Sequence, residues 1–457
     1  GDLMAHMLGY VGRINDREQK KLNQTNYSGT NHIGKIGVEK TYEDVLHGKV
    51  GFENVETNAS GRVLRVLKRV NPEKGKDIQL HLDVDLQKVA AKALGDKRGA
   101  IVALDATNGG VLAAMSTPSY DPNEFVNGIS FKDYDALKED PDIPLFNRVL
   151  QAQYPPGSVI KPIMALAGLE KGIITPYSTI DDPGWYQLPN DNRLFRDWKR
   201  VGHGKGVNLR YSMEQSCDVY YYDLAVKLGV RDIHHYYDLF GIGEKTGIDV
   251  PSERRGINPS PEWKRSQGRS NWYTGDSLNM SIGQGFLLTT PIQLAMMTTI
   301  IANDGKHFVP RMVRAIDGEA LDPVTLPPIE LKDPKHWEVV KDSMFAVVHG
   351  KRGTARGIAK GLKYKMGGKT GTAQVVGIAQ GEKYDAKALK ERQRDHALFV
   401  GFAPYENPQI AVAVMVENGG SGSSVAAPLA RKVMDAWILR HQLELKATDE
   451  GNHAAKQ

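Results

Sequence analysis

Short apolar runs, each of strand length, stand near both ends of a long middle section of the chain. Residues 100–104 and 111–115 form one pair of runs around a turn, and residues 397–402 and 410–416 form a second pair. Gly, Pro, Asn and Asp residues lie between the runs, and this pattern predicts β-strands joined by tight turns. A helical pattern over residues 426–443 predicts one terminal helix after the last strand.

The N-terminal part of the chain has a different texture. Residues 1–95 are polar and rich in turn signals, and an alternating stretch at residues 77–82 predicts a strand. We therefore predict a small N-terminal unit over residues 1–95, a larger unit over residues 96–445 and a disordered tail over residues 446–457. Strands followed by helices, more strands and a helix are typical of an α+β layered fold, and not of a regular βαβ chain.

Composition and charge exclude several classes of protein. The chain has 457 residues, of which 40% are apolar and 25% charged, as in an ordinary globular protein of roughly two to four domains. Its 59 basic and 54 acidic residues are scattered, so the net charge of +5 forms no patch of the kind that binds nucleic acid. No apolar run reaches the roughly eighteen residues of a membrane span. The single cysteine, Cys217, excludes an intrachain disulfide.

A first candidate for chemistry lies in the sequence Tyr-Pro-Pro-Gly-Ser-Val-Ile-Lys-Pro at residues 154–162. A rigid turn here meets the start of an apolar helical pattern, which places Ser158 at a helix N-terminus. Lys161 follows Ser158 by three residues, so both side chains lie on the same face of the predicted helix, about one turn apart. The helix dipole favours negative charge that develops beside Ser158. The alternative is a simple helix cap, since Ser-x-x-Lys occurs by chance about once or twice in a chain of this length.

A second candidate is the tripeptide Ser216-Cys217-Asp218. Residues i and i+2 diverge on a helix, so Ser216 and Asp218 converge on one site only if the tripeptide interrupts the helical run. In that case Cys217 points the other way. The alternative is an ordinary polar loop between two helices.

A third candidate is the segment Lys369-Thr370-Gly371-Thr372, which follows two glycines. The pattern predicts a strand whose backbone a ligand approaches closely. Lys369 offers a positive charge for a carboxylate, and Thr370 and Thr372 offer hydroxyl groups. The alternative is a basic edge strand without a ligand.

Together and in this order, the three segments resemble the active-site set of the penicillin-binding proteins and serine β-lactamases. The chain resembles the class B penicillin-binding proteins, and within them the branch of rod-shaped Gram-negative bacteria that serves wall elongation. It departs from the wider superfamily at Asp218, where asparagine is commoner, but an acidic residue there resembles this branch. The likeness extends almost from end to end, through residues 105–113, 116–123, 182–185, 282–285 and 417–420.

This resemblance implies a fold and an activity. The implied fold is an antiparallel sheet flanked by helices, with the active site between them and a non-catalytic pedestal at residues 1–95. The implied activity is peptidoglycan D,D-transpeptidation through a serine acyl-enzyme that β-lactams inhibit. The resemblance implies that Ser158 is the nucleophile and that Lys161 is the general base, its amine kept neutral by burial and by the nearby Lys369. Ser216 would relay the proton, and Asp218 would orient Lys161. The residues implied to bind the substrate are Lys369, Thr370, Gly371 and Thr372.

Two other functions stay open at this point. A β-lactamase or D,D-carboxypeptidase would need an efficient deacylating base, and the chain has no Glu-x-x-Leu-Asn element of the class A kind. A scaffold would activate a membrane glycosyltransferase through the pedestal and make little use of Ser158. Length and the N-terminal unit favour the transpeptidase over the hydrolases.

The resemblance also implies a location and partners. Full-length relatives begin with a cytoplasmic stretch, one membrane helix and the earlier part of the pedestal, and the abrupt start at Gly1 is consistent with the removal of these parts. We expect a single-pass inner-membrane protein with a periplasmic catalytic domain. The expected partners are peptidoglycan stem peptides, β-lactam antibiotics, a RodA-type glycosyltransferase and the MreC scaffold.

The lone cysteine raises one further hypothesis. Asp182, Asp197, His203 and Cys217 all lie between the nucleophile and the end of the second segment, and their types suit a tetrahedral zinc ion. Their spacing matches no standard zinc pattern. The four residues either hold a structural zinc or comprise an inert buried cysteine, two surface acids and a loop histidine. We expect no cofactor for the chemistry itself.

Overall fold

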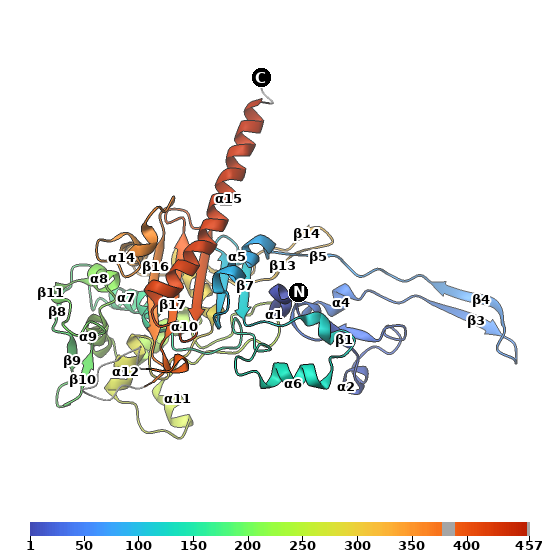
Figure 1. The fold of residues 1–457 in the computed structure, drawn as a ribbon, viewed down its shortest axis with the longest axis horizontal. Coiled ribbons are helices and arrows are strands. Elements are labelled where there is room, and N and C mark those ends of the chain that lie inside the picture. The colour runs from blue at the N-terminus through green and yellow to red at the C-terminus, as the bar shows by residue number, and fades with distance from the viewer. Residues whose placement is uncertain (377–388, 455–457) are drawn as a thin grey trace.

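A five-stranded antiparallel sheet forms the centre of the computed structural model, which describes residues 1–376 and 389–454 (Figure 1). The strand order is β16-β17-β18-β6-β7, so β16 is an edge strand. Each predicted pair of apolar runs forms a pair of neighbouring strands, and β18 joins the two pairs by pairing with β6. The strands are β6 (Gly99–Asp105), β7 (Val111–Thr117), β16 (Gly367–Ala373), β17 (His396–Ala403) and β18 (Ile410–Val416).

Helices cover both faces of this sheet, which explains why all of its strands except β16 are nearly continuous apolar runs. Helices α5 and α15 pack against each other and against β7, β17 and β18, while α13 and α14 pack on the sheet from the other side. The bounds are α5 (Val84–Leu94), α13 (Pro291–Ala302), α14 (Lys335–His349) and α15 (Ala427–Ala454). The observed layers confirm the predicted α+β fold with an antiparallel sheet between helices.

The part of the chain between β7 and β16 supplies most of the remaining helices and several short hairpins. Within the described ranges, no helix is both long and apolar enough to cross a membrane. The helical elements of this part are η2 (Pro122–Phe125), α6 (Phe131–Glu139), η3 (Gly157–Ile160), α7 (Lys161–Glu170), α8 (Leu209–Glu214), α9 (Asp218–Leu228), α10 (Val230–Leu239), α11 (Pro261–Ser266), α12 (Thr274–Ser281) and η4 (Arg356–Ala359). Two short elements follow β16, η5 (Glu391–Gln393) and the π-helical turn η6 (Gly422–Ala426). The strands are β8 (Ile180–Asp182), β9 (Trp185–Gln187), β10 (Leu194–Arg196), β11 (Gly204–Val207), β12 (His307–Phe308), β13 (Val313–Ile316), β14 (Glu319–Ala320) and β15 (Thr325–Leu326).

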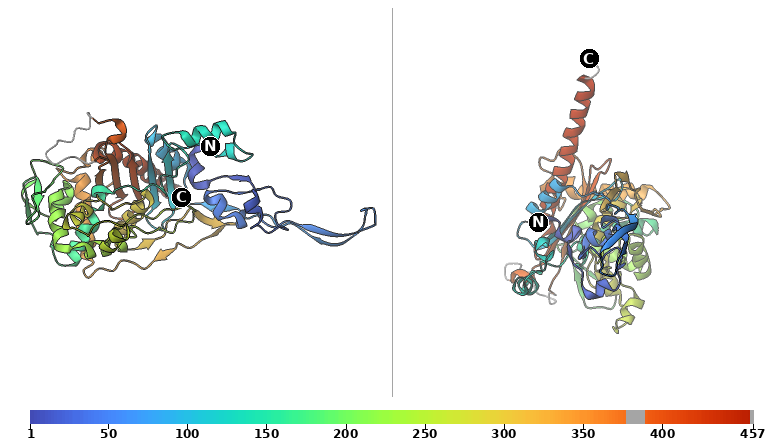
Figure 2. Two further views of the ribbon diagram at one scale, coloured as in Figure 1. Left: turned by 90° about the horizontal axis from the view of Figure 1, so that it is seen from below. Right: turned by 90° about the vertical axis from the view of Figure 1, so that its right-hand side faces the viewer.

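The N-terminal unit extends away from the sheet, and its β3–β4 hairpin projects farthest (Figures 1 and 2). Strand β5 of this unit pairs with β13 of the larger unit and so connects the two. The elements are η1 (Asp2–Met4), α1 (Ala5–Leu8), β1 (Val11–Arg13), α2 (Asp16–Gln19), β2 (His32–Gly34), α3 (Gly37–Thr41), α4 (Glu43–Leu46), β3 (Phe52–Thr57), β4 (Val63–Val70) and β5 (Ile78–Leu80).

The structure differs from the sequence-based boundaries at two helices. Helix α5 lies inside the predicted residues 1–95 but packs on the sheet, because its side chains at Leu86, Ala90 and Leu94 form one buried face. Helix α15 continues to Ala454, past its predicted end at residue 443 and through most of the expected disordered tail. Leucine, lysine and alanine are strong helix formers and occupy this segment. Residues 455–457 of the tail lie outside the described residues.

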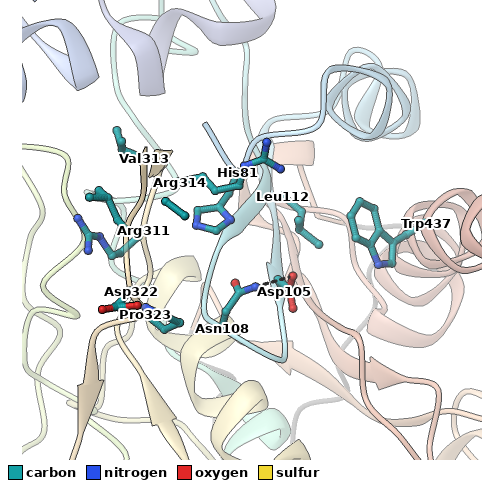
Figure 3. Close-up of a pocket in the computed structure, with 12 residues that line it drawn as sticks. His81, Asp105, Asn108, Leu112, Arg311, Val313, Arg314, Asp322, Pro323 and Trp437 are labelled. Atoms are coloured by element: carbon teal, nitrogen blue, oxygen red, sulfur yellow. Dashed lines mark hydrogen bonds between the residues drawn. The ribbon is translucent and has the colours of Figure 1, made fainter. Parts of the chain in front are cut away.

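A cavity of about 320 Å³ lies where β5, the β6–β7 turn and α15 meet (Figure 3). His81, Asn108, Arg311 and Trp437 are among the residues that line it. It contains none of the residues that the sequence predicts for catalysis, so the candidate active site lies elsewhere, at the edge strand β16.

Candidate active site

Ser158 lies at the start of a helix, as its sequence context predicts. The 3-10 turn η3 contains Ser158 and leads directly into α7, which accommodates Pro162 in its first turn. Gly157 has a φ of 57° and approaches β16 so closely that a Cβ atom there would lie 2.5 Å from the carbonyl oxygen of Thr372. Glycine is therefore required at this position, and it brings Ser158 against the strand of the third segment.

The second segment interrupts a helical run, which is what convergence of its side chains requires. Helix α8 ends at Glu214 and α9 begins at Asp218, and Ser216 between them has a φ of 59° in the left-handed region. Such a conformation is costly for a residue other than glycine and often marks a functional site. The reversal turns Ser216 and Asp218 toward Lys161, whereas Cys217 is buried with its sulfur 3.3 Å from Asp182 Oδ2.

Two buried lysines converge on the Ser216 hydroxyl. Lys161 Nζ lies 2.7 Å from Asp218 Oδ1, 2.8 Å from the Ser216 carbonyl oxygen and 3.3 Å from Ser216 Oγ. Lys369 Nζ donates to the same Ser216 Oγ over 2.8 Å. A hydroxyl can both donate and accept, so Ser216 is placed to pass a proton between the two amines.

Lys369 is buried inside the protein, although the sequence predicted that it would bind a substrate carboxylate. Its side chain is fully buried, and its second hydrogen bond, of 3.0 Å, goes to the Thr370 carbonyl oxygen. Burial, followed by the charge of Lys161, holds the pKa of Lys369 well below its ordinary value. The amine of Lys369 thus faces Ser216 inside the protein, where the sequence suggested a charge presented to a ligand.

The other residues of the third segment lie on the edge strand β16, as predicted. Thr372 is exposed, while Thr370 is buried and its hydroxyl lies 2.8 Å from Thr354 Oγ1. Gly371 packs on the nucleophile turn so tightly that a Cβ atom would lie 2.9 Å from Val159. An unpaired strand edge of this kind is suited to an extended peptide that adds to the sheet.

Ser158 and Lys161 lie one turn apart, but no hydrogen bond joins their side chains in the part of the chain that the structure describes. The Lys161 amine is fully buried and is held by Asp218 and Ser216. The Ser158 side chain is half-exposed. The candidate nucleophile is therefore accessible to a substrate, and the amines that could take its proton lie behind it.

Three residues of the site are absent from the sequence-based set. Gln284 donates from Nε2 to the Thr372 carbonyl oxygen over 3.1 Å, and it lies in one of the segments that carry the family resemblance. Thr354 contacts Thr370, and Trp198 donates to two groups beside Ser216. Thr354 and Trp198 stand in loops without any distinctive local pattern, so only the folded chain reveals them.

The four residues predicted for zinc come together directly behind the Ser216 turn. Asp182, Asp197, His203 and Cys217 are all buried, and one potential ligand atom from each lies within 4.8 Å of the others. His203 Nδ1 lies 2.6 Å from Asp182 Oδ2 and 3.6 Å from Asp197 Oδ2. The alternative expectation of surface acids is therefore wrong, because Asp182 and Asp197 are buried where the β8–β11 loops fold inward over the start of α9. His203 does lie in a loop, but it is buried there as well.

Burial of these groups has a clear electrostatic consequence. Burial, and next the Asp218 carboxylate, raise the pKa of Asp197 to about 7. Burial lowers the pKa of His203 and raises that of the Cys217 thiol. Burial thus opposes the charged forms of Asp197, His203 and Cys217, whereas hydrogen bonds from His203 and the Gly184 backbone outweigh burial at Asp182 and lower its pKa. A divalent cation would favour the deprotonated forms of all four groups.

The four-residue cluster is joined to the catalytic turn by main-chain hydrogen bonds. Asp197 Oδ2 accepts from the backbone N–H groups of Asp218 at 2.7 Å and of Val219 at 3.3 Å, so it caps the N-terminus of α9. Any shift of Asp197 therefore moves Asp218, which holds Lys161.

Comparison with known proteins identifies the family. A family model described as the penicillin binding protein transpeptidase domain matches residues 99–435, and one described as the penicillin-binding protein dimerisation domain matches residues 1–80. The chain belongs to the penicillin-binding proteins. This confirms the family that the three sequence segments indicate.

Two relatives show how far the similarity extends. The peptidoglycan D,D-transpeptidase MrdA of Acinetobacter baumannii is 49% identical over 443 residues, which are 96% of this chain and 65% of that protein. MrdA of Escherichia coli is 45% identical over 447 residues, which are 96% of this chain and 70% of that protein. The chain thus spans about two thirds of the length of these relatives.

Solved structures of penicillin-binding protein 2 match the fold. The Pseudomonas aeruginosa protein in complex with WCK 5153 is 50% identical with a TM-score of 0.86, covering 96% of this chain and 89% of that one. The Helicobacter pylori protein in complex with MreC is 36% identical with a TM-score of 0.87, covering 96% and 78%. These matches place the chain on the penicillin-binding protein 2 branch and confirm the predicted enzyme class, a peptidoglycan D,D-transpeptidase.

Proposed function

We propose that this penicillin-binding protein cross-links peptidoglycan stem peptides through a Ser158 acyl-enzyme during lateral wall elongation. The observation that carries the proposal is the hydrogen-bonded set of Lys161, Ser216, Lys369 and Asp218 behind an accessible serine at a helix start. A nucleophile and a proton path stand together there, which is the arrangement that acyl transfer needs.

In the proposed acylation, Ser158 Oγ bonds to the carbonyl carbon of the penultimate D-Ala of a donor stem. The Ser158 proton passes to Lys161 as Lys161 releases one of its own to Ser216. Ser216 in turn protonates Lys369, whose depressed pKa makes its amine an acceptor. The bond to the terminal D-Ala breaks, and the departing amine takes a proton back through Ser216. Asp218 keeps the Lys161 ammonium in place throughout.

The substrate is proposed to lie along β16. Backbone N–H groups of Ser158 and Thr372 are the proposed donors to the oxyanion, and the close contact of Gly157 with Thr372 supports this pairing. The hydroxyls of Thr370 and Thr372, with Gly371 between them, are the proposed contacts of the substrate carboxylate. The amine of a second stem peptide then resolves the acyl-enzyme.

The persistence of a penicillin label tests this function against hydrolysis. The sequence has no Glu-x-x-Leu-Asn element of the kind that serves deacylation in class A β-lactamases, so we expect labelled penicillin to remain on the protein for many minutes. Mass spectrometry of the intact protein over time measures the label and its site. Loss of the label within seconds would instead identify a β-lactamase-like hydrolase.

Substituting Lys369→Met is expected to slow acylation by penicillin by roughly 100-fold, the lower end of what one proton-transfer group contributes. The substitution removes the amine that Ser216 Oγ contacts but keeps most of the side-chain volume in a fully buried position. Stopped-flow acylation measures the effect. Lys365→Met is the matched control, because Lys365 is exposed and pairs with Glu406. Equal rates for the wild type and Lys369→Met would remove Lys369 from the proton path.

We further propose that Asp182, Asp197, His203 and Cys217 hold a structural zinc ion. Carboxylate, imidazole and thiolate groups are the ligands that zinc prefers, and tetrahedral coordination needs ligand atoms about 3.4 Å apart, given bonds of about 2.1 Å. The observed separations of up to 4.8 Å require only small movements. When bound, the ion would tie the β8–β11 loops to the Ser216 turn, and four protein ligands would leave no position for a reactive water.

The partners and location are proposed from the relatives. The Helicobacter pylori relative forms a complex with MreC, and another solved relative, 34% identical, is described as part of a peptidoglycan synthase complex. We propose that this chain works with an MreC scaffold and a RodA-type glycosyltransferase. Its transpeptidase domain would then act in the periplasm and be anchored to the inner membrane. Co-purification with each partner from cells tests this proposal.

A further inference from the structure

Trp198 lies in the loop between β10 and β11 and makes two hydrogen bonds to the catalytic turn. Its indole Nε1–H donates to the Gln215 carbonyl oxygen over 3.1 Å. Its backbone N–H donates to Asp218 Oδ2 over 3.1 Å. The two acceptors lie immediately before Ser216 and two residues after it, so one tryptophan holds both sides of the turn.

The turn that Trp198 holds is conformationally strained. Ser216 is in the left-handed region, which a side chain other than glycine adopts only when the surrounding structure enforces it. The peptide group that follows Ser216 is fixed from inside by Lys161, whose amine donates to the Ser216 carbonyl oxygen over 2.8 Å. The peptide group that precedes Ser216 has two hydrogen bonds: its N–H donates to the Met213 carbonyl oxygen over 3.2 Å, and its carbonyl oxygen accepts from the indole of Trp198.

Packing alone does not account for the position of Trp198. Its side chain is 59% exposed, although tryptophan contributes most to stability when it is buried. The ring contacts His203, with 5.8 Å between the ring centroids. The polar end of the indole is thus engaged with the turn, while much of the apolar ring faces solvent.

We propose that Trp198 is a positioning residue for acylation, which fixes Ser216 so that its hydroxyl stays between Lys161 and Lys369. This inference rests on the proposed transpeptidase function. If the indole bond is lost, the preceding peptide group keeps only its bond to Met213, the turn becomes less rigid, and Ser216 Oγ spends less time between the two amines. The rate of the chemical step then falls, whereas the initial affinity for the β-lactam does not change.

The test is the substitution Trp198→Phe, which keeps an aromatic ring and the backbone N–H but removes the indole donor. We expect the acylation rate constant for penicillin to fall roughly 3- to 10-fold, the range that corresponds to one ordinary hydrogen bond. The dissociation constant of the non-covalent complex, the thermal midpoint and the zinc content should match those of the wild type. Stopped-flow measurements over a range of penicillin concentrations separate the rate constant from the dissociation constant.

Trp185→Phe is the matched control, since Trp185 lies on the neighbouring strand β9 and is 38% exposed. Its acylation rate should equal that of the wild type. An unchanged rate constant in Trp198→Phe would overturn the positioning role, and so would a change confined to the dissociation constant, which would make Trp198 a ligand contact. A wild type that penicillin does not acylate would instead overturn the proposed function.

Discussion

Ser158→Ala is expected to abolish covalent labelling by penicillin while leaving the fold intact. The Ser158 side chain is half-exposed and makes no hydrogen bond among the described residues, so its hydroxyl contributes little to stability. Without it, the Ser216 hydroxyl still lies beside the amines of Lys161 and Lys369, but Ser216 is buried and is not expected to be acylated. Mass spectrometry after penicillin exposure should show only the unmodified mass, and thermal unfolding should match that of the wild type.

Ser130→Ala provides the matched control for this experiment. Ser130 caps α6 by accepting a hydrogen bond from the Asp133 backbone N–H, and losing such a cap costs about 0.5–2 kcal/mol. The control should therefore be less stable than Ser158→Ala and yet acquire the label fully. A labelled Ser158→Ala protein would refute the assignment of the nucleophile.

The same variant separates an enzyme from a scaffold in cells. If the chain acts mainly by activating a glycosyltransferase, Ser158→Ala should still support rod shape when it replaces the native protein. If the acyl-enzyme is the function, cells that depend on the variant should become round. Equal abundance of both proteins, measured on the same cells, makes the comparison valid.

Local sequence predicts the parts of this site that depend on local geometry. A turn before an apolar helical pattern places Ser158, and the divergence of alternate residues on a helix shows that Ser216 must break the run. The apolar runs predict four of the five strands of the central sheet, because a strand covered on both faces is apolar along its whole length. The fifth strand, β16, follows from the glycines and threonines around Lys369.

Other features depend on tertiary contacts that local patterns do not encode. Lys369 is fully buried because α14 and the nucleophile turn pack on β16. The sequence of the strand alone suggested that Lys369 offers its charge to a substrate carboxylate. Trp198 and Thr354 reach the site from loops whose sequences carry no periodicity. The residue types of Asp182, Asp197, His203 and Cys217 suggested a zinc site. Their proximity, however, depends on loops that fold inward, which the local sequence does not predict.

Removing the proposed zinc ion from the cluster of Asp182, Asp197, His203 and Cys217 should lower stability and slow acylation together. A bound ion that is absent from the unfolded chain stabilises the fold by its binding free energy, so stripping it should lower the thermal midpoint by roughly 5–10 °C. Acylation should slow because Asp197 caps α9 at Asp218, which in turn holds Lys161. Calorimetry and stopped-flow acylation of one sample, before and after a chelator and again after added zinc, measure both effects.

Cys217→Ser tests the same ion without a chelator. The substitution keeps the shape of the side chain, but a neutral hydroxyl is a poor replacement for a thiolate ligand, so zinc content, thermal midpoint and acylation rate should all fall. Asp181→Asn is the matched control, because Asp181 adjoins the cluster in sequence but is exposed and accepts only from the Gly206 backbone in the described structure. Elemental analysis of protein purified without added metal or a metal-affinity step gives the number of zinc ions per chain directly. Less than about a tenth of an equivalent of zinc would return Cys217 to the role of a small buried apolar residue. In that case the pKa of Asp197, raised to about 7, would leave its carboxyl roughly half protonated near neutral pH, so that it caps α9 without a full charge.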